Sequence, residues 1–178
     1  MAINDNKSPD QEYNVGDYVV YPAHGVGQVK SIETHTIGGM NVDLYAIVFE
    51  KDRMRLKIPV MKVKDSGLRK ISTGERMGEA LETLQGKSKI RRTMWSRRAQ
   101  EYEAKINSGD PVSIAEVLRD LKRVDDDQEQ SYSERQIYQS ALKRLAREMA
   151  AIEELSEKKA IERLEDILGV EHDQSLAA

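Results

Sequence analysis

The pattern of apolar residues changes near residue 70 and divides the chain into two parts. Before that point, four short stretches either alternate apolar with small or polar side chains or are apolar throughout: Asp17–Tyr21, Val26–Ile32, Leu44–Phe49 and Met54–Val60. Alternation with a period of two is typical of β-strands, because successive side chains point to opposite faces of a sheet. Gly38 and Gly39 lie between two of these stretches and predict a hairpin turn. We therefore expect roughly five short antiparallel strands in this part of the chain.

From residue 71 onward, apolar residues recur every three or four positions, which is the period of an amphipathic helix. Start and stop signals divide this region into about five helices: Ser72 with Glu75 in a capping-box pattern, Asp110 followed by Pro111, Ser133, Ser156 and Gly169. The apolar stripe of each helix has to be buried against its neighbours. The pattern therefore predicts a compact all-α domain.

The predicted fold class is α+β, with two domains joined near residue 70. Residues 14–70 are expected to form a small antiparallel β-barrel, and residues 71–169 a compact all-α domain of about five helices. The polar residues 1–13 are expected to be a disordered tail, and residues 170–178 a flexible one.

The composition limits the classes of protein to which the chain can belong. Its 178 residues carry a net charge of −3 and no cysteine, which excludes a disulfide framework, a thiolate metal site and cysteine catalysis. No apolar run reaches the ~20 residues needed to span a bilayer, so we expect a cytoplasmic protein without a membrane partner. His24, His35 and His172 lack metal-ligand spacing. We expect no metal ion, no cofactor and no catalytic residue.

Two glycine motifs are similar to phosphate-binding loops but lack the surrounding sequence that such loops need. Gly25-Val26-Gly27 leads into a strand and not a helix, so a tight turn is expected there. Gly86-Lys87-Ser88 matches the end of a P-loop, but Leu81 stands where that motif requires a glycine. Neither motif predicts a nucleotide site.

One stretch, Lys87–Arg98, concentrates positive charge in a chain that is acidic overall. It contains no acidic residue and six basic ones: Lys87, Lys89, Arg91, Arg92, Arg97 and Arg98. Such a patch favours contact with phosphate. Trp95, the only tryptophan of the chain, lies within it. A rigid aromatic ring beside phosphate-binding cations indicates stacking on bases or wedging between them.

The residues alone leave two interpretations of Trp95 open. A single tryptophan often packs in a core. Alternatively, the indole contacts bases while Arg91 and Arg92 hold phosphate at the start of the helix, where free backbone N–H groups favour anions. Trp95, Arg98 and Tyr102 share one face of that helix, which is compatible with either role.

The apolar strand Leu44–Phe49 also has two interpretations. A continuous apolar run is typical of a strand buried in a core. If the strand instead lies at the edge of its sheet, it could pair with a strand of another protein.

Several segments match, in order, the pattern of one known family: Val15–Gly27, Ile32–Ile37, Leu56–Val60, Trp95–Arg98, Lys105–Ile106, Ser108–Asp110 and Ala115–Leu121. On these residues the chain resembles the CarD/CdnL family of bacterial transcription regulators, over about residues 14–168. The N-terminal segments alone are similar to the RNA-polymerase-interacting domain of transcription-repair coupling factors. The chain lacks the P-loop that the helicase motors of those factors require.

The resemblance implies a Tudor-like or SH3-like barrel that docks on the RNA polymerase β subunit, partly by pairing strands. The polymerase would be a holoenzyme with the housekeeping sigma factor. The implied contact residues are His35, Ile37, Ile47, Phe49, Arg55, Lys57 and Pro59. His35 and Lys57 occupy positions where some relatives carry arginine.

The resemblance also implies that the helical domain contacts promoter DNA at the upstream edge of the transcription bubble. Trp95 would wedge into the minor groove, hinder bubble collapse and so stabilise the open promoter complex. The implied DNA-contact residues are Trp95, Arg97, Arg98, Arg91, Arg92 and Lys89. No base-specific readout is expected, because the minor groove discriminates poorly between base pairs. The protein would act as a monomer.

Two other functions stay open at this point. The chain could be a protein–protein adaptor whose barrel and helical domain each bind a protein, without direct DNA contact. It could also be an enzyme, which would require polar residues converging in a pocket.

Overall fold

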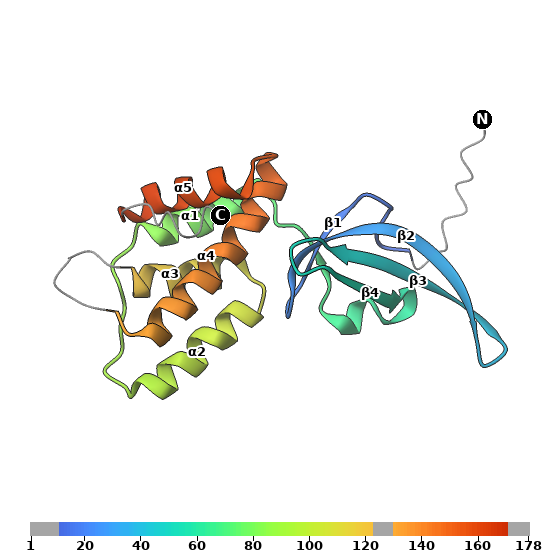
Figure 1. The fold of residues 1–178 in the computed structure, drawn as a ribbon, viewed down its shortest axis with the longest axis horizontal. Helices are drawn as coiled ribbons and strands as arrows, with labels where there is room; N and C mark the ends of the chain where they lie inside the picture. The colour runs from blue at the N-terminus through green and yellow to red at the C-terminus, as the bar shows by residue number, and fades with distance from the viewer. Residues whose placement is uncertain (1–10, 123–129, 171–178) are drawn as a thin grey trace. The chain divides into compact units, whose positions relative to one another are not determined.

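The computed structural model describes residues 11–122 and 130–170, and the chain divides after Lys70 into two compact units (Figure 1). The first unit is built from strands and the second from helices. The α+β fold class predicted from the sequence is thus confirmed. Each unit is described by itself below.

The first unit is an antiparallel sheet with the strand order β4-β3-β2-β1-β5. Its strands are β1 (Tyr18–Tyr21), β2 (Gly25–Ile37), β3 (Met40–Phe49), β4 (Met54–Pro59) and β5 (Arg69–Lys70). Gly38 and Gly39, with φ of 59° and 80°, form the predicted turn between β2 and β3. Two short 3₁₀-helices, η1 (Val60–Lys62) and η2 (Lys64–Ser66), connect β4 to β5.

The sheet is open, so the prediction of a closed barrel is wrong. Strands β4 and β5 lie at opposite ends of the strand order and do not pair with each other. The chain between them is folded as η1 and η2, and β5 is only two residues long. A barrel needs enough strand to close its hydrogen-bond ladder, which this stretch does not supply.

The core of the first unit lies on one face of the sheet and is formed by buried residues of every strand from β1 to β4: Val19, Val29, Tyr45, Ile47, Phe49 and Ile58. Tyr13, which the sequence analysis assigned to a disordered tail, belongs to this core. Its backbone N–H donates to the Tyr45 hydroxyl at 3.1 Å, and its own hydroxyl donates to the Leu68 carbonyl at 3.0 Å. Burial raises the pKa of Tyr13 to about 12. The ordered unit therefore begins earlier than residue 14.

Gly27 is required by packing and not by a turn. It lies within β2, opposite Val19 of β1. A Cβ atom at Gly27 would lie 2.8 Å from Cε1 of Phe49 and 2.9 Å from Cγ2 of Ile47. Because real Cβ contacts are longer than this, only glycine lets the Phe49 ring approach β2 so closely. Within the glycine motif noted in the sequence, Gly27 thus serves the core of the sheet, whereas Gly25, with φ of 77°, directly follows the expected turn.

The second unit contains five α-helices in the part of the chain that the structure describes, as the sequence predicted. They are α1 (Gly74–Leu84), α2 (Trp95–Asn107), α3 (Pro111–Leu121), α4 (Tyr132–Glu153) and α5 (Glu157–Leu168). The apolar stripes of all five meet in one core. Asp110 and Ser156 cap α3 and α5 as predicted, and Gly169 ends α5 in the left-handed conformation with φ of 72°. Val170, which was expected to belong to a flexible tail, packs on this core, and the rest of that expected tail, residues 171–178, lies outside the described residues.

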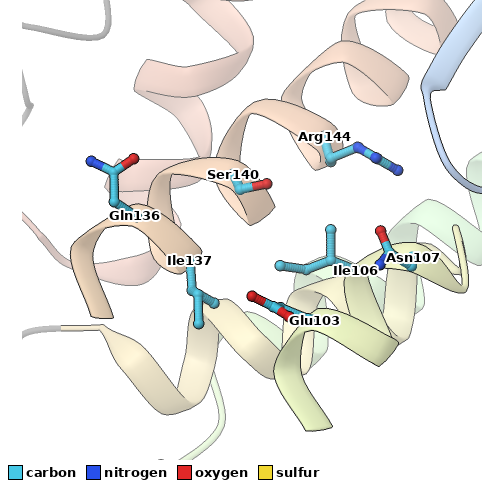
Figure 2. A pocket seen from close by; sticks show the side chains of 7 residues that line it. All are labelled: Glu103, Ile106, Asn107, Gln136, Ile137, Ser140 and Arg144. Atoms are coloured by element: carbon cyan, nitrogen blue, oxygen red, sulfur yellow. The ribbon is translucent and has the colours of Figure 1, made fainter. Parts of the chain in front are cut away.

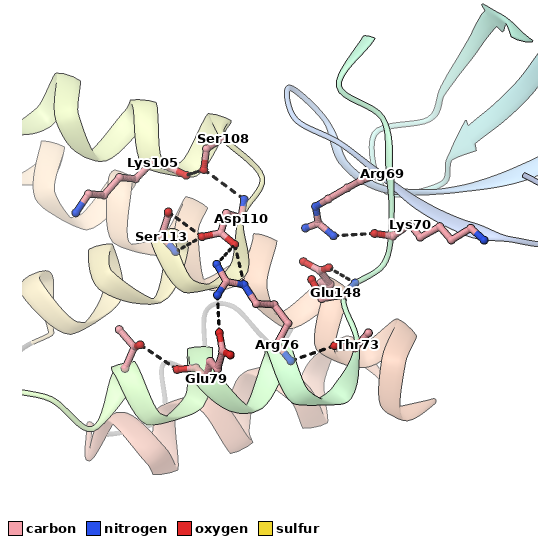
Figure 3. Close-up of polar contacts among 12 residues, drawn as sticks. Arg69, Lys70, Thr73, Arg76, Glu79, Lys105, Ser108, Asp110, Ser113 and Glu148 are labelled. Atoms are coloured by element: carbon pink, nitrogen blue, oxygen red, sulfur yellow. Dashed lines mark hydrogen bonds and ion pairs between the residues drawn. The ribbon is translucent and has the colours of Figure 1, made fainter. Parts of the chain in front are cut away.

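Two predicted helix starts are shifted. Thr73, and not Ser72, caps α1, and the Ser72 backbone N–H donates to Oε1 of buried Glu148 at 2.8 Å (Figure 3). Ser131, and not Ser133, caps α4 in a reciprocal capping box with Glu134. In both cases the sequence offers two serine or threonine candidates for the capping position.

Charged side chains connect α1 to the corner between α2 and α3. Arg76 of α1 donates to Oδ1 of Asp110 at 2.8 Å and also pairs with Glu79 (Figure 3). Asp110 simultaneously accepts from the Ser113 backbone N–H at 3.0 Å. The pKa of Asp110 is lowered: burial opposes the shift, but the hydrogen bonds from Arg76 and Ser113 outweigh it.

Candidate functional site

The basic segment (Lys87–Arg98) begins with irregular backbone that is anchored to the end of α3. Asp120 is 6% exposed, and its Oδ1 accepts hydrogen bonds from the Lys89 backbone N–H and from Nε of Arg119, both at 2.9 Å. The Ser88 hydroxyl donates to the Asp120 carbonyl at 3.0 Å. Lys122 donates to two carbonyls just before the segment, those of Leu84 at 3.1 Å and Gly86 at 3.2 Å. These hydrogen bonds thus fix the path of the basic segment before α2, although that part forms neither helix nor strand.

The cations of the basic segment face solvent, with one exception. Five of them are exposed: Lys87, Lys89, Arg91, Arg92 and Arg97. The first four make no ion pair with any described residue, and Arg97 lies 3.9 Å from Glu101 with its side chain 75% exposed. Arg98 alone is half-buried. A row of unpaired, solvated cations is the arrangement that phosphate contacts require.

Trp95 is the first residue of α2, and its indole is partly packed and partly exposed. One side packs against the helical core, and the ring lies 6.4 Å from the Tyr102 ring. The guanidinium of Arg98 lies over the indole, 5.3 Å from its centre. The indole Nε1–H donates to the Ser133 hydroxyl at 3.3 Å. The residue is therefore neither a fully buried core side chain nor one that projects freely into solvent.

The start of α2 leaves backbone donors available beside the indole. Met94 occupies the capping position and its side chain makes no capping hydrogen bond. The first N–H groups of a helix have no acceptor within the helix, and they favour anions. They lie at the end of the basic segment, so the backbone adds to its attraction for phosphate.

Sequence reasoning missed the exposed side chains that lie next to Trp95 and Ser133 in the chain. Met94 and Tyr132 are each 78% exposed, and the hydrogen bond from Trp95 to Ser133 brings the starts of α2 and α4 together. Tyr132 is far from the basic segment in sequence, and no local pattern connects the two. Tyr132 is the first residue of α4 and directly precedes Ser133, which accepts the hydrogen bond from the indole. Only this position relates Tyr132 to the indole.

A second candidate surface lies on the sheet, where three ionisable side chains form the charged cluster (Glu33, Lys57 and the imidazole of His35). Nζ of Lys57 lies 2.8 Å from Oε2 of Glu33, and Nε2 of His35 lies 2.9 Å from the same oxygen. Lys57 is on β4 and the other two are on β2, so the contacts cross β3. Hydrogen bonds from Lys57 and then His35 lower the pKa of Glu33 to about 2. Lys57 and His35 are thus joined by one carboxylate.

The seven residues that the sequence analysis assigned to a polymerase contact differ in their exposure to solvent. His35, Ile37, Arg55 and Lys57 are exposed, and Pro59 is half-buried. Ile47 and Phe49 are 0% and 1% exposed in the sheet core, so their side chains are not available to a partner. Their assignment to the contact surface stays a prediction, and β3, the strand that carries them, is paired on both sides and lies inside the sheet. The strand Leu44–Phe49 is a core strand and not an edge strand.

A cavity of about 300 Å³ lies in the groove between α2 and α4, at a place that the sequence did not indicate (Figure 2). Ile106 and Ile137 supply apolar surface, and polar side chains surround them: Glu103, Asn107, Gln136, Ser140 and Arg144. In the described part of the chain, no group of three histidine or acidic side chains could hold a metal ion, and His172 lies outside that part. No helix among the described residues is both long and apolar enough to cross a membrane.

Two segments of the chain match family models. Residues 13–72 match the CarD-like/TRCF RID domain, and residues 79–165 match the C-terminal domain of CarD. The chain belongs to the CarD family. The first matched segment contains the charged cluster of the sheet, and the second contains the basic segment with Trp95.

The chain is also similar to a bacterial protein of nearly its own length. The “Putative transcription factor YdeB” of Bacillus subtilis (strain 168) is 27% identical over 146 residues, which cover 82% of this chain and 95% of that protein. The CarD family is a family of transcription factors and not a known enzyme family. Membership therefore supports a role in transcription regulation through interaction with RNA polymerase.

Proposed function

We propose that the protein binds the RNA polymerase β subunit and stabilises the open promoter complex, with Trp95 wedged into the minor groove at the upstream edge of the bubble. One observation carries this proposal. The only tryptophan of the chain is held at a helix start, partly exposed. Four exposed cations that have no carboxylate partner among the described residues precede it: Lys87, Lys89, Arg91 and Arg92. Cations that hold phosphate next to a ring that can oppose base stacking are what minor-groove wedging requires.

The sheet supplies the polymerase contact in this proposal. Strand β4 ends the strand order, so one of its edges has no partner strand among the described residues. An unpaired edge can add a strand of another protein through main-chain hydrogen bonds. The exposed side chains of Arg55 and Lys57 lie on this strand and would select the partner by charge. The bound partner would be the β subunit of a holoenzyme that carries the housekeeping sigma factor.

The energies involved are compatible with a weak DNA contact. Unstacking a base step costs a few kcal/mol, and an inserted indole offsets part of that cost. A gain of about 1.4 kcal/mol changes the open-complex equilibrium about tenfold. Docking on polymerase raises the local concentration of the helical unit at the promoter, so low intrinsic affinity for DNA is sufficient. An acidic protein with one basic segment can therefore act on DNA.

The test is the lifetime of open complexes formed with Trp95→Ala protein. Removing the indole removes the wedge, so we expect the lifetime to shorten toward that of polymerase alone. Competitor-challenge assays on a promoter template measure it, with co-purification of polymerase as the control for docking. Tyr138→Phe is a matched aromatic control on the helical core. An unchanged lifetime of the Trp95→Ala complex, with docking intact, would reject the wedge.

The adaptor function is the second candidate, because apolar surface lies beside the indole. Met94 and Tyr132 are largely exposed, and such side chains also suit a protein surface. The two functions differ in their salt dependence. Five exposed cations on phosphate predict that log affinity for duplex DNA falls with log salt at a slope of about −4.5. A slope near zero for the full-length protein would favour the adaptor.

A further inference from the structure

We infer that Arg98 and Ser133 are positioning residues that hold the Trp95 indole, and that Arg98 is not a phosphate ligand. This inference rests on the proposed function, because the orientation of the indole affects the open complex only if the indole wedges into the DNA. Its two supports come from different helices, α2 and α4, and contact different parts of the ring.

The environment of Arg98 differs from that of the neighbouring cations. The side chain of Arg97 is 75% exposed, whereas Arg98 is half-buried. The guanidinium carbon of Arg98 lies over the indole, 5.3 Å from the ring centre, which is within cation–π distance. Its Nε atom is buried and has no hydrogen-bond partner among the described residues. This N–H is closed off from solvent, so it is not available to a phosphate in this arrangement.

Ser133 restrains the opposite end of the contact, at the ring nitrogen. Its hydroxyl is not needed as a helix cap, because Ser131 caps α4. The hydroxyl instead accepts the indole N–H at 3.3 Å. A stack over the ring face and a hydrogen bond at its edge together restrict rotation of the side chain. A ring ordered before DNA arrives avoids the entropy loss of being ordered on binding.

Because Trp95 is the only tryptophan, the intrinsic fluorescence of the protein reports on this ring alone. We expect Ser133→Ala and Arg98→Gln each to increase acrylamide quenching and to lower the fluorescence anisotropy of the free protein. Ser133→Thr keeps the hydroxyl and should restore wild-type values. Ser140→Ala, on the same helix, is the matched control and should change neither quantity. Thermal melts show whether each variant folds, and Arg98→Met, which also removes the charge, replaces any Arg98→Gln protein that does not.

The salt dependence of DNA binding separates a positioning role from phosphate contact. Arg97→Gln removes an exposed cation, so the slope of log affinity against log salt should become shallower by about 0.9. Arg98→Gln should weaken binding to a fork-junction duplex while leaving that slope unchanged. A slope that changes equally in both variants would overturn the assignment of Arg98.

Open-complex lifetimes complete the test. Ser133→Ala should shorten the lifetime part of the way toward the Trp95→Ala value. Increased quenching with a wild-type lifetime would overturn the positioning role, and unchanged quenching in both variants would overturn the restraint itself. If Trp95→Ala has no effect on the lifetime, the wedge fails, and the restraint is then judged on fluorescence alone.

Discussion

The two candidate surfaces treat positive charge in opposite ways. On the sheet, Lys57 and His35 share the carboxylate of Glu33, and Lys30 lies 3.7 Å from Glu50. In the basic segment, the exposed lysines and arginines have no carboxylate partner closer than the 3.9 Å contact of Arg97 with Glu101 among the described residues. The chain is acidic overall, so this difference does not follow from composition.

The difference indicates two kinds of recognition. Unpaired cations attract any polyanion and lose that attraction as salt rises. Cations that already share a carboxylate contribute little long-range attraction, but they present a fixed set of donors and acceptors to a partner. The helical unit is thus suited to a contact that is independent of sequence, and the sheet to a specific docking partner.

Removing two cations of the basic segment should have the largest effect on DNA binding and tests whether the two surfaces differ. The double variant Arg91→Ala/Arg92→Ala should make the slope of log affinity against log salt shallower by about 1.8. When salt falls from 1 M to 0.1 M, its duplex affinity should therefore rise by a factor roughly 60-fold smaller than that of the wild type. Fluorescence anisotropy with a labelled duplex measures it across a salt series.

The matched control removes the same charge from the sheet. We expect Arg55→Ala/Lys57→Ala to leave the salt slope nearly unchanged and to weaken co-purification with polymerase. If both double variants change the slope equally, the two surfaces do not differ in kind.

Loosening the anchor of the basic segment should have an intermediate effect. Ser88→Ala removes the hydrogen bond to the Asp120 carbonyl, a loss of about 1 kcal/mol or roughly fivefold in affinity if the whole of it is felt by DNA. The charges are unchanged, so the salt slope should stay the same while affinity falls. Ser96→Ala, an exposed serine of the same segment, serves as the control in the same titration. Equal affinities for the two variants would show that the anchor does not contribute.

The smallest effect is expected from titrating Glu33, which tests the pairing of its carboxylate on the sheet. Its pKa is lowered from 4.5 to about 2, so the pairing with Lys57 and His35 is fully present above pH 4.5 and is lost as pH falls toward 2. Carbon-detected NMR of the side-chain carboxyl should give a midpoint well below that of an ordinary glutamate. Lys57→Met should raise the midpoint, because the largest cause of the shift is removed. A midpoint that does not move would mean that Lys57 does not hold the carboxylate in solution.

The sequence predicted the elements well because their signals are local. Alternation located the strands, a period near 3.6 located the helices, and Asp110 followed by Pro111 marked a helix start that the structure confirms. The choice between Ser131 and Ser133 failed because both precede a glutamate or glutamine by three residues. Ser131 is the cap, and the Ser133 hydroxyl instead accepts from the indole of Trp95 across two helices.

The candidate site was predictable in its residues and not in their contacts. The basic segment and Trp95 stand out by composition alone. The sequence does not show that Arg98 lies on the indole while Arg97 faces solvent, since both follow Trp95 in one run of basic residues. Nor does it show that Glu33 contacts both Lys57 and His35, because register across three strands brings these residues together.

One edge of β4 has no partner strand in the part of the chain that the structure describes, which has a consequence for how the protein behaves at high concentration. A free strand edge is a template on which further copies can assemble into aggregates. Lysine, arginine and proline on an edge strand oppose such growth, through repulsion between copies and a missing N–H, and β4 carries Arg55, Lys57 and Pro59. The same residues would therefore have two effects. They would favour binding of polymerase at this edge, and they would oppose pairing of the edge with another copy of the protein.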